Sequence, residues 1–122
     1  MPVENQGFPK SCRLLDSSAY EDVFNKPDFR ISNKYILILG RKTPMGSARL
    51  GVIVSKKNVA RATARNRVKR VIREAFRTTK SLLPSCDLVI LSRKGLDSLD
   101  NEKCRACIDE LLEEIKRKHS TE

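Results

Sequence analysis

The sequence is poor in aromatic residues and in histidine. It has no tryptophan, aromatic residues are 5% of its 122 positions, and His119 is its one histidine. A core with so few rings is mainly aliphatic, which disfavours a large pocket for an aromatic ligand. No apolar run approaches the roughly 20 residues that span a bilayer, and residues 1–10 lack the apolar stretch of a secretory signal. The composition excludes membrane-spanning and disulfide-scaffold classes and predicts a cytoplasmic globular protein.

The length predicts one domain over residues 1–122, with a loose segment at 1–11 and a frayed tail at 117–122. Hydropathy patterns within it predict helices and strands in the mixed order of an α+β sandwich. In chain order, these are a helix from Ser17 or Ser18 to 25–27, a weak strand near 30–31, strands over 34–39 and 49–54 joined as a hairpin by a turn over 40–46, a helix capped by Thr63 and closed by Pro84, a strand over 87–91, and a helix capped by Asp100 or Asn101.

Positive charge is concentrated in one interior segment. The whole chain carries a formal net charge of +10, and residues 55–80 account for +9 of it, with ten basic residues and one acidic residue. The basic residues are Lys56, Lys57, Arg61, Arg65, Arg67, Lys69, Arg70, Arg73, Arg77 and Lys80. A concentrated block in a nearly neutral chain indicates a polyanionic partner. Nucleic acid is favoured over a membrane surface, because the block lacks the bulky apolar face of interfacial helices.

The same segment also has an apolar stripe at helical spacing, so it is expected to pack on the protein rather than form a disordered basic tail. The stripe consists of Ala64, Val68, Val71, Ile72, Ala75, Phe76 and Thr79. Arg65, Lys69 and Arg73 lie within about 80° of arc beside the stripe. The predicted helix therefore has one face for the core and a broad cationic face for a ligand.

The residues that carry bond chemistry are scarce. His119 lies in the terminal tail and has no evident acid–base partner. Glu74 is the one acidic residue of the basic segment, and its position beside Arg70 and Arg73 favours an intrahelical ion pair over a metal ligand. The sequence predicts neither a catalytic residue nor a metal site in the protein itself.

Four cysteines do not change this prediction. Cys104 and Cys107 form a C-x-x-C pair, but both fall on the apolar stripe of the last predicted helix, together with Ile108, Leu111, Leu112 and Ile115. Cys12 and Cys86 stand alone, so the spacing of a zinc site is not met. Reduced, buried thiols are the favoured interpretation.

Residues 55–77 closely resemble the signature of the bacterial ribonuclease P protein subunit. The resemblance rests on Lys56-Lys57, on Arg65-Asn66-Arg67 followed by Lys69-Arg70, and on Arg73-Glu74-Ala75-Phe76-Arg77. The flanks also match: Arg13-Leu14-Leu15 with Ser18-Ala19-Tyr20 and Val23-Phe24 resembles the family's first helix, and Arg49-Leu50-Gly51-Val52 resembles the strand before the lysine pair. An isolated R-N-R tripeptide would be weak evidence for the family, whereas the whole run of residues is a specific match to its signature.

The resemblance implies a fold and an activity. The fold is a two-layer αβββαβα sandwich with a small mixed sheet and a left-handed β-α-β crossover, although crossovers are right-handed as a rule. The family's protein assists a catalytic RNA that, with Mg²⁺, removes the 5′ leader of precursor tRNA. The implied partners are the RNA subunit, bound 1:1, and precursor tRNA. The holoenzyme is an endoribonuclease whose catalysis and Mg²⁺ are associated with the RNA.

The resemblance also implies which residues contact RNA. The residues expected to face RNA are Lys56, Lys57, Arg61, Arg65, Asn66, Arg67, Lys69, Arg70 and Arg73. Tyr20 and Phe24 match the aromatic pair of the leader cleft, where bases would stack on the rings. Spacing alone would instead favour Tyr20 and Phe24 as core residues. Where some members carry a further aromatic residue on the first long strand, this chain has Ile38.

Two other functions fit parts of the sequence. A ribosomal-type RNA-binding protein would explain the basic segment, but not the coincidence of Tyr20 and Phe24 with Lys56 and Lys57. A protein-only nuclease would need acidic or histidine residues near the basic surface, and the inventory argues against it.

Overall fold

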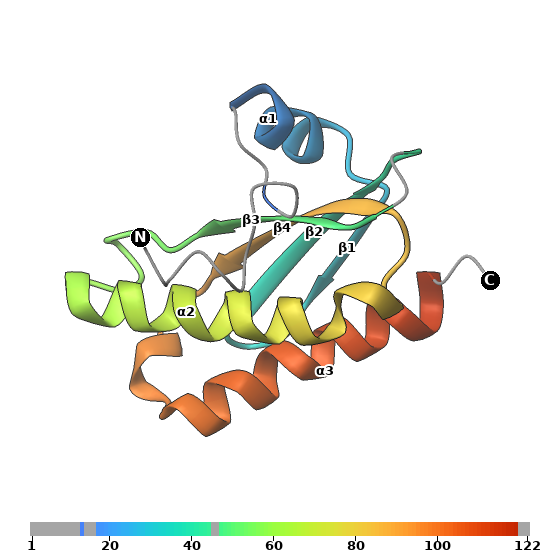
Figure 1. Ribbon diagram of the computed structural model, residues 1–122. Helices are drawn as coiled ribbons and strands as arrows, with labels where there is room; N and C mark the ends of the chain where they lie inside the picture. Colours follow the sequence, from blue (N-terminus) through green and yellow to red (C-terminus); the bar gives the residue numbers. More distant parts are fainter. Residues whose placement is uncertain (1–12, 14–16, 45–46, 120–122) are drawn as a thin grey trace, which may run out of the picture.

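The computed structural model describes Arg13, residues 17–44 and residues 47–119 (Figure 1). The elements, in chain order, are α1 Ser17–Asn25, β1 Phe29–Ser32, β2 Ile36–Lys42, β3 Arg49–Ile53, α2 Ala62–Thr79, the 3₁₀ turn η3 Lys80–Leu82, β4 Cys86–Ser92, the 3₁₀ turn η4 Leu96–Ser98 and α3 Asn101–His119. The predicted αβββαβα order is confirmed. The predicted loose segment, residues 1–11, lies outside the described residues, whereas α3 extends into the predicted tail as far as His119.

The sheet has the strand order β1-β2-β4-β3, with β1–β2 and β2–β4 antiparallel and β3–β4 parallel. The predicted hairpin between β2 and β3 is wrong, because β4 lies between them. The reason is the burial of β4, in which Leu88, Val89 and Ile90 are all 0% exposed. A strand that is apolar on both faces requires a central position in the sheet. The hairpin was predicted because the two strands are neighbours in the sequence, and that closeness does not reveal which strand is central.

The start of β2 also differs from the prediction. Asn33 Oδ1 accepts hydrogen bonds from the backbone N–H groups of Tyr35 and Ile36, at 3.0 and 2.9 Å. This side chain forms the turn between β1 and β2, so the strand begins at Ile36 and continues through the predicted turn as far as Lys42. The Asn33 amide also donates to the Cys107 carbonyl at 3.2 Å, which ties the turn to α3.

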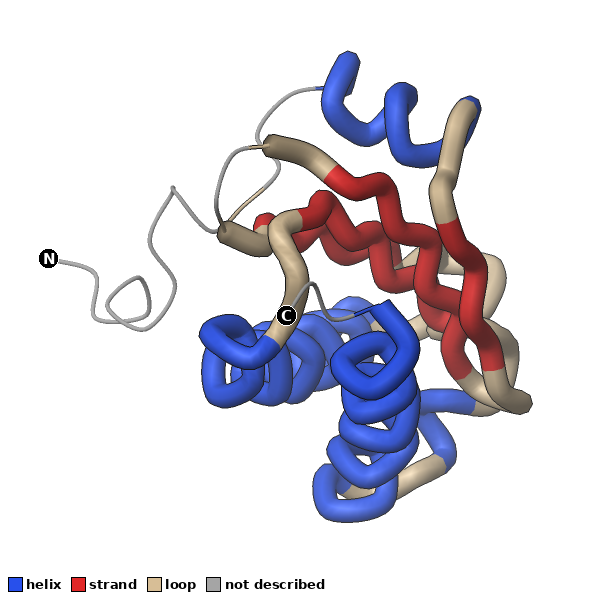
Figure 2. Tube along the Cα trace, turned by 90° about the vertical axis from the view of Figure 1, so that its right-hand side faces the viewer, coloured by secondary structure: helices blue, strands red, loops and turns tan. Residues whose placement is uncertain are grey.

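The crossover from β3 to β4 runs through α2. Figures 1 and 2 together show that the path from β3 through α2 to β4 turns in the left-handed sense, as the resemblance implies. Both α2 and α3 cover one face of the sheet, and α1 lies on the other face. Of the helices in the described part of the chain, only α1 lies on its face of the sheet.

The two sheet faces have different cores. The larger core joins β4 residues Leu88 and Ile90 to α2 and α3, through side chains such as Phe76. The smaller cluster centres on Val23 of α1 with Val89, and Tyr20 packs against it from the side. The alternation along β4 therefore assigns even-numbered residues to the helical layer and odd-numbered residues to the face of α1.

The helix boundaries correct one predicted cap and confirm another. Helix α2 begins at Ala62 and has Arg61, not Thr63, in the N-cap position, and the Arg61 side chain makes no capping hydrogen bond. At α3, the Asp100 carboxylate accepts a hydrogen bond from the Lys103 backbone N–H at 2.8 Å. Asp100 is therefore the cap, because its side chain satisfies one of the N–H groups that the first turn leaves without a partner.

The thiols agree with the prediction of reduced, buried cysteines. Burial, with a smaller contribution from Asp87, raises the pKa of Cys86 to about 12, and burial raises the pKa of Cys104 to about 11. Both groups stay protonated at neutral pH. Cys107 is half-buried, also with a raised pKa, and Cys12 lies outside the described residues.

Arg67 joins α2 to the segment that leads into α3. Its Nη1 donates to the Leu99 carbonyl at 3.3 Å and to Asn101 Oδ1 at 2.9 Å, and its Nη2 donates to the Asp97 carbonyl at 3.1 Å. A planar guanidinium suits this role because its donors lie in a fixed fork. Arg67 thus fixes η4 and the start of α3 against α2.

We expect Arg67→Ala to lower the free energy of unfolding by about 1–3 kcal/mol, because three carbonyl or amide oxygens lose a charged donor. Urea denaturation measures this loss. The matched control is Arg70→Ala on the same helix, where the side chain is exposed and the expected change is within about 0.5 kcal/mol. Equal stabilities for the two variants would show that the Arg67 bonds do not hold the helices together.

Candidate nucleic-acid interface

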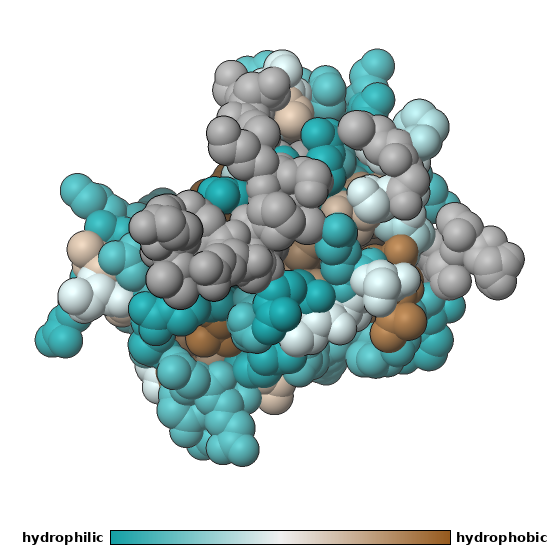
Figure 3. Space-filling model, in the orientation of Figure 1, coloured by the Kyte–Doolittle hydropathy of each residue, from teal (hydrophilic) through white to brown (hydrophobic). Residues whose placement is uncertain are grey.

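The cations of α2 occupy two sides of its outer surface. Arg65, Lys69 and Arg73 lie on the side towards β3 and α1, whereas Arg67 and Arg70 lie on the side towards α3. Figure 3 shows that hydrophilic side chains cover most of the visible face of α2, with small apolar patches between them. The structure therefore divides the predicted RNA-facing set into two groups.

Lys56 and Lys57 lie in the loop before α2, and both side chains are exposed. The loop is held by hydrogen bonds from the Val59 N–H to the Ser55 carbonyl at 2.9 Å and from the Asn58 amide to the Ser92 carbonyl at 3.0 Å. The two lysines are thus presented on an ordered turn. The sequence analysis missed Asn58, whose anchoring role depends on β4 lying beside the loop.

Arg65 connects this loop to the helix. Its Nη1 donates to the carbonyls of Val59 and Ala60, at 3.1 and 2.8 Å. Both bonds use one nitrogen, so Nε and Nη2 donate to no described residue and can contact a phosphate. Arg65 therefore fits two roles, one in shaping the lysine loop and one in binding an anion.

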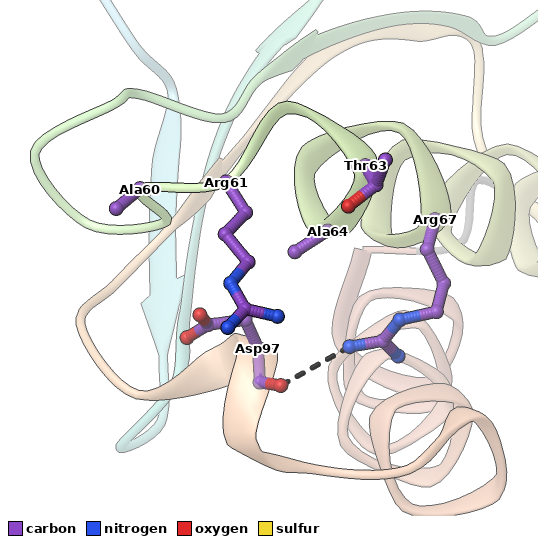
Figure 4. Close-up of a pocket in the computed structure, with 6 residues that line it drawn as sticks. All are labelled: Ala60, Arg61, Thr63, Ala64, Arg67 and Asp97. Atoms are coloured by element: carbon purple, nitrogen blue, oxygen red, sulfur yellow. Dashed lines mark hydrogen bonds between the residues drawn. The ribbon is translucent and has the colours of Figure 1, made fainter.

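Arg67 is placed differently from its neighbours in the R-N-R motif. Its three hydrogen bonds face η4 and α3, while Asn66 between the two arginines is exposed. Arg67 and Arg61 line a cavity of about 480 Å³ at the start of α2, together with Thr63 and Asp97 (Figure 4). The dashed contact in Figure 4 is the bond from Arg67 to the Asp97 carbonyl.

The aromatic pair of α1 lies on the opposite face of the sheet. Phe24 is 42% exposed and therefore is not a core residue, whereas the core position of α1 is taken by Val23. Tyr20 is half-buried and lies directly over Gly51 of β3, where an added Cβ would come within 2.5 Å of the ring carbon Cε1. The sequence analysis did not single out Gly51 for this role, because the close approach of a ring is visible only in three dimensions.

Arg73 links the cationic side of α2 to this aromatic pair. Burial lowers the pKa of Arg73, the positive charge of Arg13 lowers it further, and Tyr20 acts in the opposite direction. Arg13 itself forms a bridge to Leu50 at the outer edge of β3. Arg73 thus interacts electrostatically with Arg13, at the β3 edge of the sheet, and with Tyr20 of α1, and its guanidinium remains charged.

Aliphatic side chains of the strands pack around the smaller cluster on the α1 face. Leu37, Leu91 and Ile53 are adjacent in the strand register and half-buried on this face. Ile38 is 0% exposed and belongs to the larger core on the other face. Ile38 therefore does not face the aromatic pair of α1, because neighbouring residues of a strand point to opposite faces.

The predicted intrahelical ion pair of Glu74 is present, and its partner is Arg77. Hydrogen bonding to Arg77 lowers the pKa of Glu74. Among the described residues there is no group of three or more His, Cys, Asp or Glu side chains that could hold a metal ion. None of the described helices is long and apolar enough to cross a bilayer.

Comparisons with known proteins match this arrangement. The sequence model of the family described as Ribonuclease P matches residues 8–116. The ribonuclease P protein component of Marinobacter nauticus is 44% identical over 112 residues, which cover 92% of this chain and 84% of that protein. The protein component of Escherichia coli O157:H7 is 43% identical over 112 residues, which cover 92% and 90%. The solved RNase P protein of Thermotoga maritima is 33% identical with a TM-score of 0.74, over 88% of this chain and 98% of that one. The chain belongs to the ribonuclease P protein family.

Proposed function

We propose that the chain is the protein subunit of ribonuclease P, and that it binds the catalytic RNA and the 5′ leader of precursor tRNA in a 1:1 complex. The holoenzyme is an endoribonuclease that removes the leader, with catalysis carried by the RNA. The observation that supports this most is the electrostatic interaction of Arg73, one of the cations of α2, with Tyr20 of α1. It connects the cationic side of α2 with the aromatic pair of α1.

The two parts of the surface suit two parts of an RNA strand. Arg65, Lys69 and Arg73, with the lysines of the loop before α2, can neutralise phosphates, to which Arg offers a bidentate fork and Lys a mobile charge. Tyr20 and Phe24 can stack on unpaired bases, a contact that tolerates differences in base sequence. A leader varies in sequence from one tRNA to the next, so stacking and phosphate contacts fit it better than base-specific hydrogen bonds would.

The proposal assigns Mg²⁺ to the assembled holoenzyme and derives no chemical step on the protein. The protein's contribution is electrostatic. Cations that lie against the RNA replace part of the condensed counterion atmosphere and reduce the repulsion between the leader and the RNA subunit. We therefore expect the protein to matter most when Mg²⁺ is scarce.

The direct test is reconstitution with the cognate RNA subunit. The purified chain alone should not cut precursor tRNA, and it should increase the rate of cutting by the RNA at low Mg²⁺. The stimulation should shrink as Mg²⁺ rises, since the ion then supplies the missing neutralisation. Cleavage without the RNA subunit, or no stimulation with it, contradicts the proposal.

A second test separates phosphate contacts from internal bonds on α2. Lys69→Ala should flatten the dependence of log affinity on log salt by about 0.7–0.9, because one phosphate contact is lost. Arg67→Ala should leave the salt dependence nearly unchanged even if the affinity falls, since its donors are used within the protein. Filter binding to the RNA subunit over a salt series measures both salt dependences. A flattened salt dependence for Arg67→Ala and an unchanged one for Lys69→Ala would show that Arg67, and not Lys69, contacts a phosphate.

A third test concerns the aromatic pair. Phe24→Ala should weaken binding of long-leader precursor by about 1–3 kcal/mol and spare mature tRNA, because a stacking platform is lost. Its exposure keeps the cost in stability small. Tyr20→Phe is the control, since it keeps the ring and removes only the hydroxyl. Equal losses for precursor and mature tRNA would place Phe24 outside the leader path.

A further inference from the structure

A second aromatic side chain lies among cations at the end of the sheet where β3 and β4 finish. The aromatic residue is Tyr35, which precedes β2 and is half-buried. The cations of three neighbouring loops form what we call the basic rim: Lys34, Lys56, Lys57, Arg93 and Lys94. All five side chains are exposed, and residues 33–35, 54–60 and 92–96 contain no acidic residue. Lys34, Arg93 and Lys94 lie outside the segment that carries the family signature.

Backbone contacts hold the three loops together. The Arg93 N–H donates to the Tyr35 carbonyl at 2.8 Å, and Arg93 Nη1 donates to the Asn33 carbonyl at 2.9 Å. The Asn58 amide reaches the carbonyl of Ser92 in the strand between them. Because β4 separates β2 from β3, the backbone at Tyr35 lies about 10 Å, or two strand spacings, from the loop of Lys56. The rim is therefore a short, ordered arc.

The Tyr35 ring is positioned within this arc. Lys34 Nζ lies over the ring, 5.4 Å from its centroid. Gly95 passes the ring edge with a φ of +96°, and a Cβ there would lie 3.4 Å from Cε1. Only glycine readily adopts this left-handed conformation, which lets the chain pass close beside the ring. Tyr35 also packs against the larger core.

We propose that Tyr35 is a stacking platform for an unpaired RNA base whose neighbouring phosphates contact the basic rim. The inference rests on the proposed function and extends the RNA surface beyond the cleft of Tyr20 and Phe24. The Lys34 ammonium occupies the ring face that a base would take. An exposed cation–π contact is weaker than base–aromatic stacking, so the base displaces Lys34. The displaced lysine then contacts a phosphate, and this new contact offsets the lost cation–π contact with the ring.

The test uses holoenzyme assembled from the full chain and its RNA subunit. Tyr35→Leu keeps an apolar body against the core but removes the flat ring, and Tyr35→Phe keeps the ring. Affinity is measured for precursor tRNAs whose leaders lengthen one nucleotide at a time, and separately for the RNA subunit without tRNA. A 2-aminopurine scanned along the leader reports stacking by the quenching of its fluorescence.

We expect Tyr35→Leu to lower affinity by about fivefold to a hundredfold, with Tyr35→Phe near wild type. A loss confined to longer leaders, with 2-aminopurine quenching lost at one position, assigns the base to the leader. A loss confined to the RNA subunit assigns it there. Lys34→Ala should flatten the salt dependence by about 0.7, whereas Lys103→Ala, an exposed lysine on α3, should not.

The opposite results are equally clear. Unchanged affinity of Tyr35→Leu for every RNA, or an equal loss in Tyr35→Phe, overturns the stacking platform. A loss that tracks a lowered melting temperature and is the same for all RNAs reduces Tyr35 to a core residue and also overturns it. Failure of the proposed function is distinct, because the wild-type chain would then fail to stimulate the RNA subunit at all.

Discussion

Burial of β4 on both faces is the constraint on which the rest of the structure depends. Leu88, Val89 and Ile90 are each 0% exposed, so both faces of the strand need a cover. On one face α2 and α3 provide it, and on the other α1 provides it. The central position of β4 separates β2 from β3 and places β3 at the end of the strand order. The parallel pairing of β3 and β4 then requires a crossover, and that crossover is the basic helix.

The position of the proposed RNA surface follows from this crossover. The helix that returns from the end of β3 to the start of β4 lies on one face of the sheet, with its apolar stripe on the core and its cations outward. On one side of the helix, Arg73 interacts electrostatically with Arg13 and Tyr20. The other side is used internally, since Arg67 holds the start of α3. A single helix thus supplies both the charge that is proposed to face RNA and the hydrogen bonds that hold the start of α3.

Hydropathy and charge patterns predict much of this arrangement. The element order, the apolar stripe of α2 and the Asp100 cap are local features, and local sequence is enough for them. The hairpin prediction failed because strand pairing is decided by the burial of β4, some 40 residues away. The roles of Arg67, Asn58 and Gly51 were missed for the same reason. Each depends on a distant segment that passes beside it, and the motif letters do not say which face of the helix turns inward.

The central claim is that RNA passes from α2 across the β3 edge to the aromatic pair of α1 as one strand. The most direct measurement is photo-crosslinking from a benzophenone side chain placed at Arg73 or at Phe24, in the holoenzyme bound to precursor tRNA. The account predicts crosslinks from the two positions to neighbouring nucleotides of the leader. The account would be contradicted if position 73 crosslinked to RNA while position 24 crosslinked to none. It would also be contradicted if the two positions crosslinked to distant RNA strands.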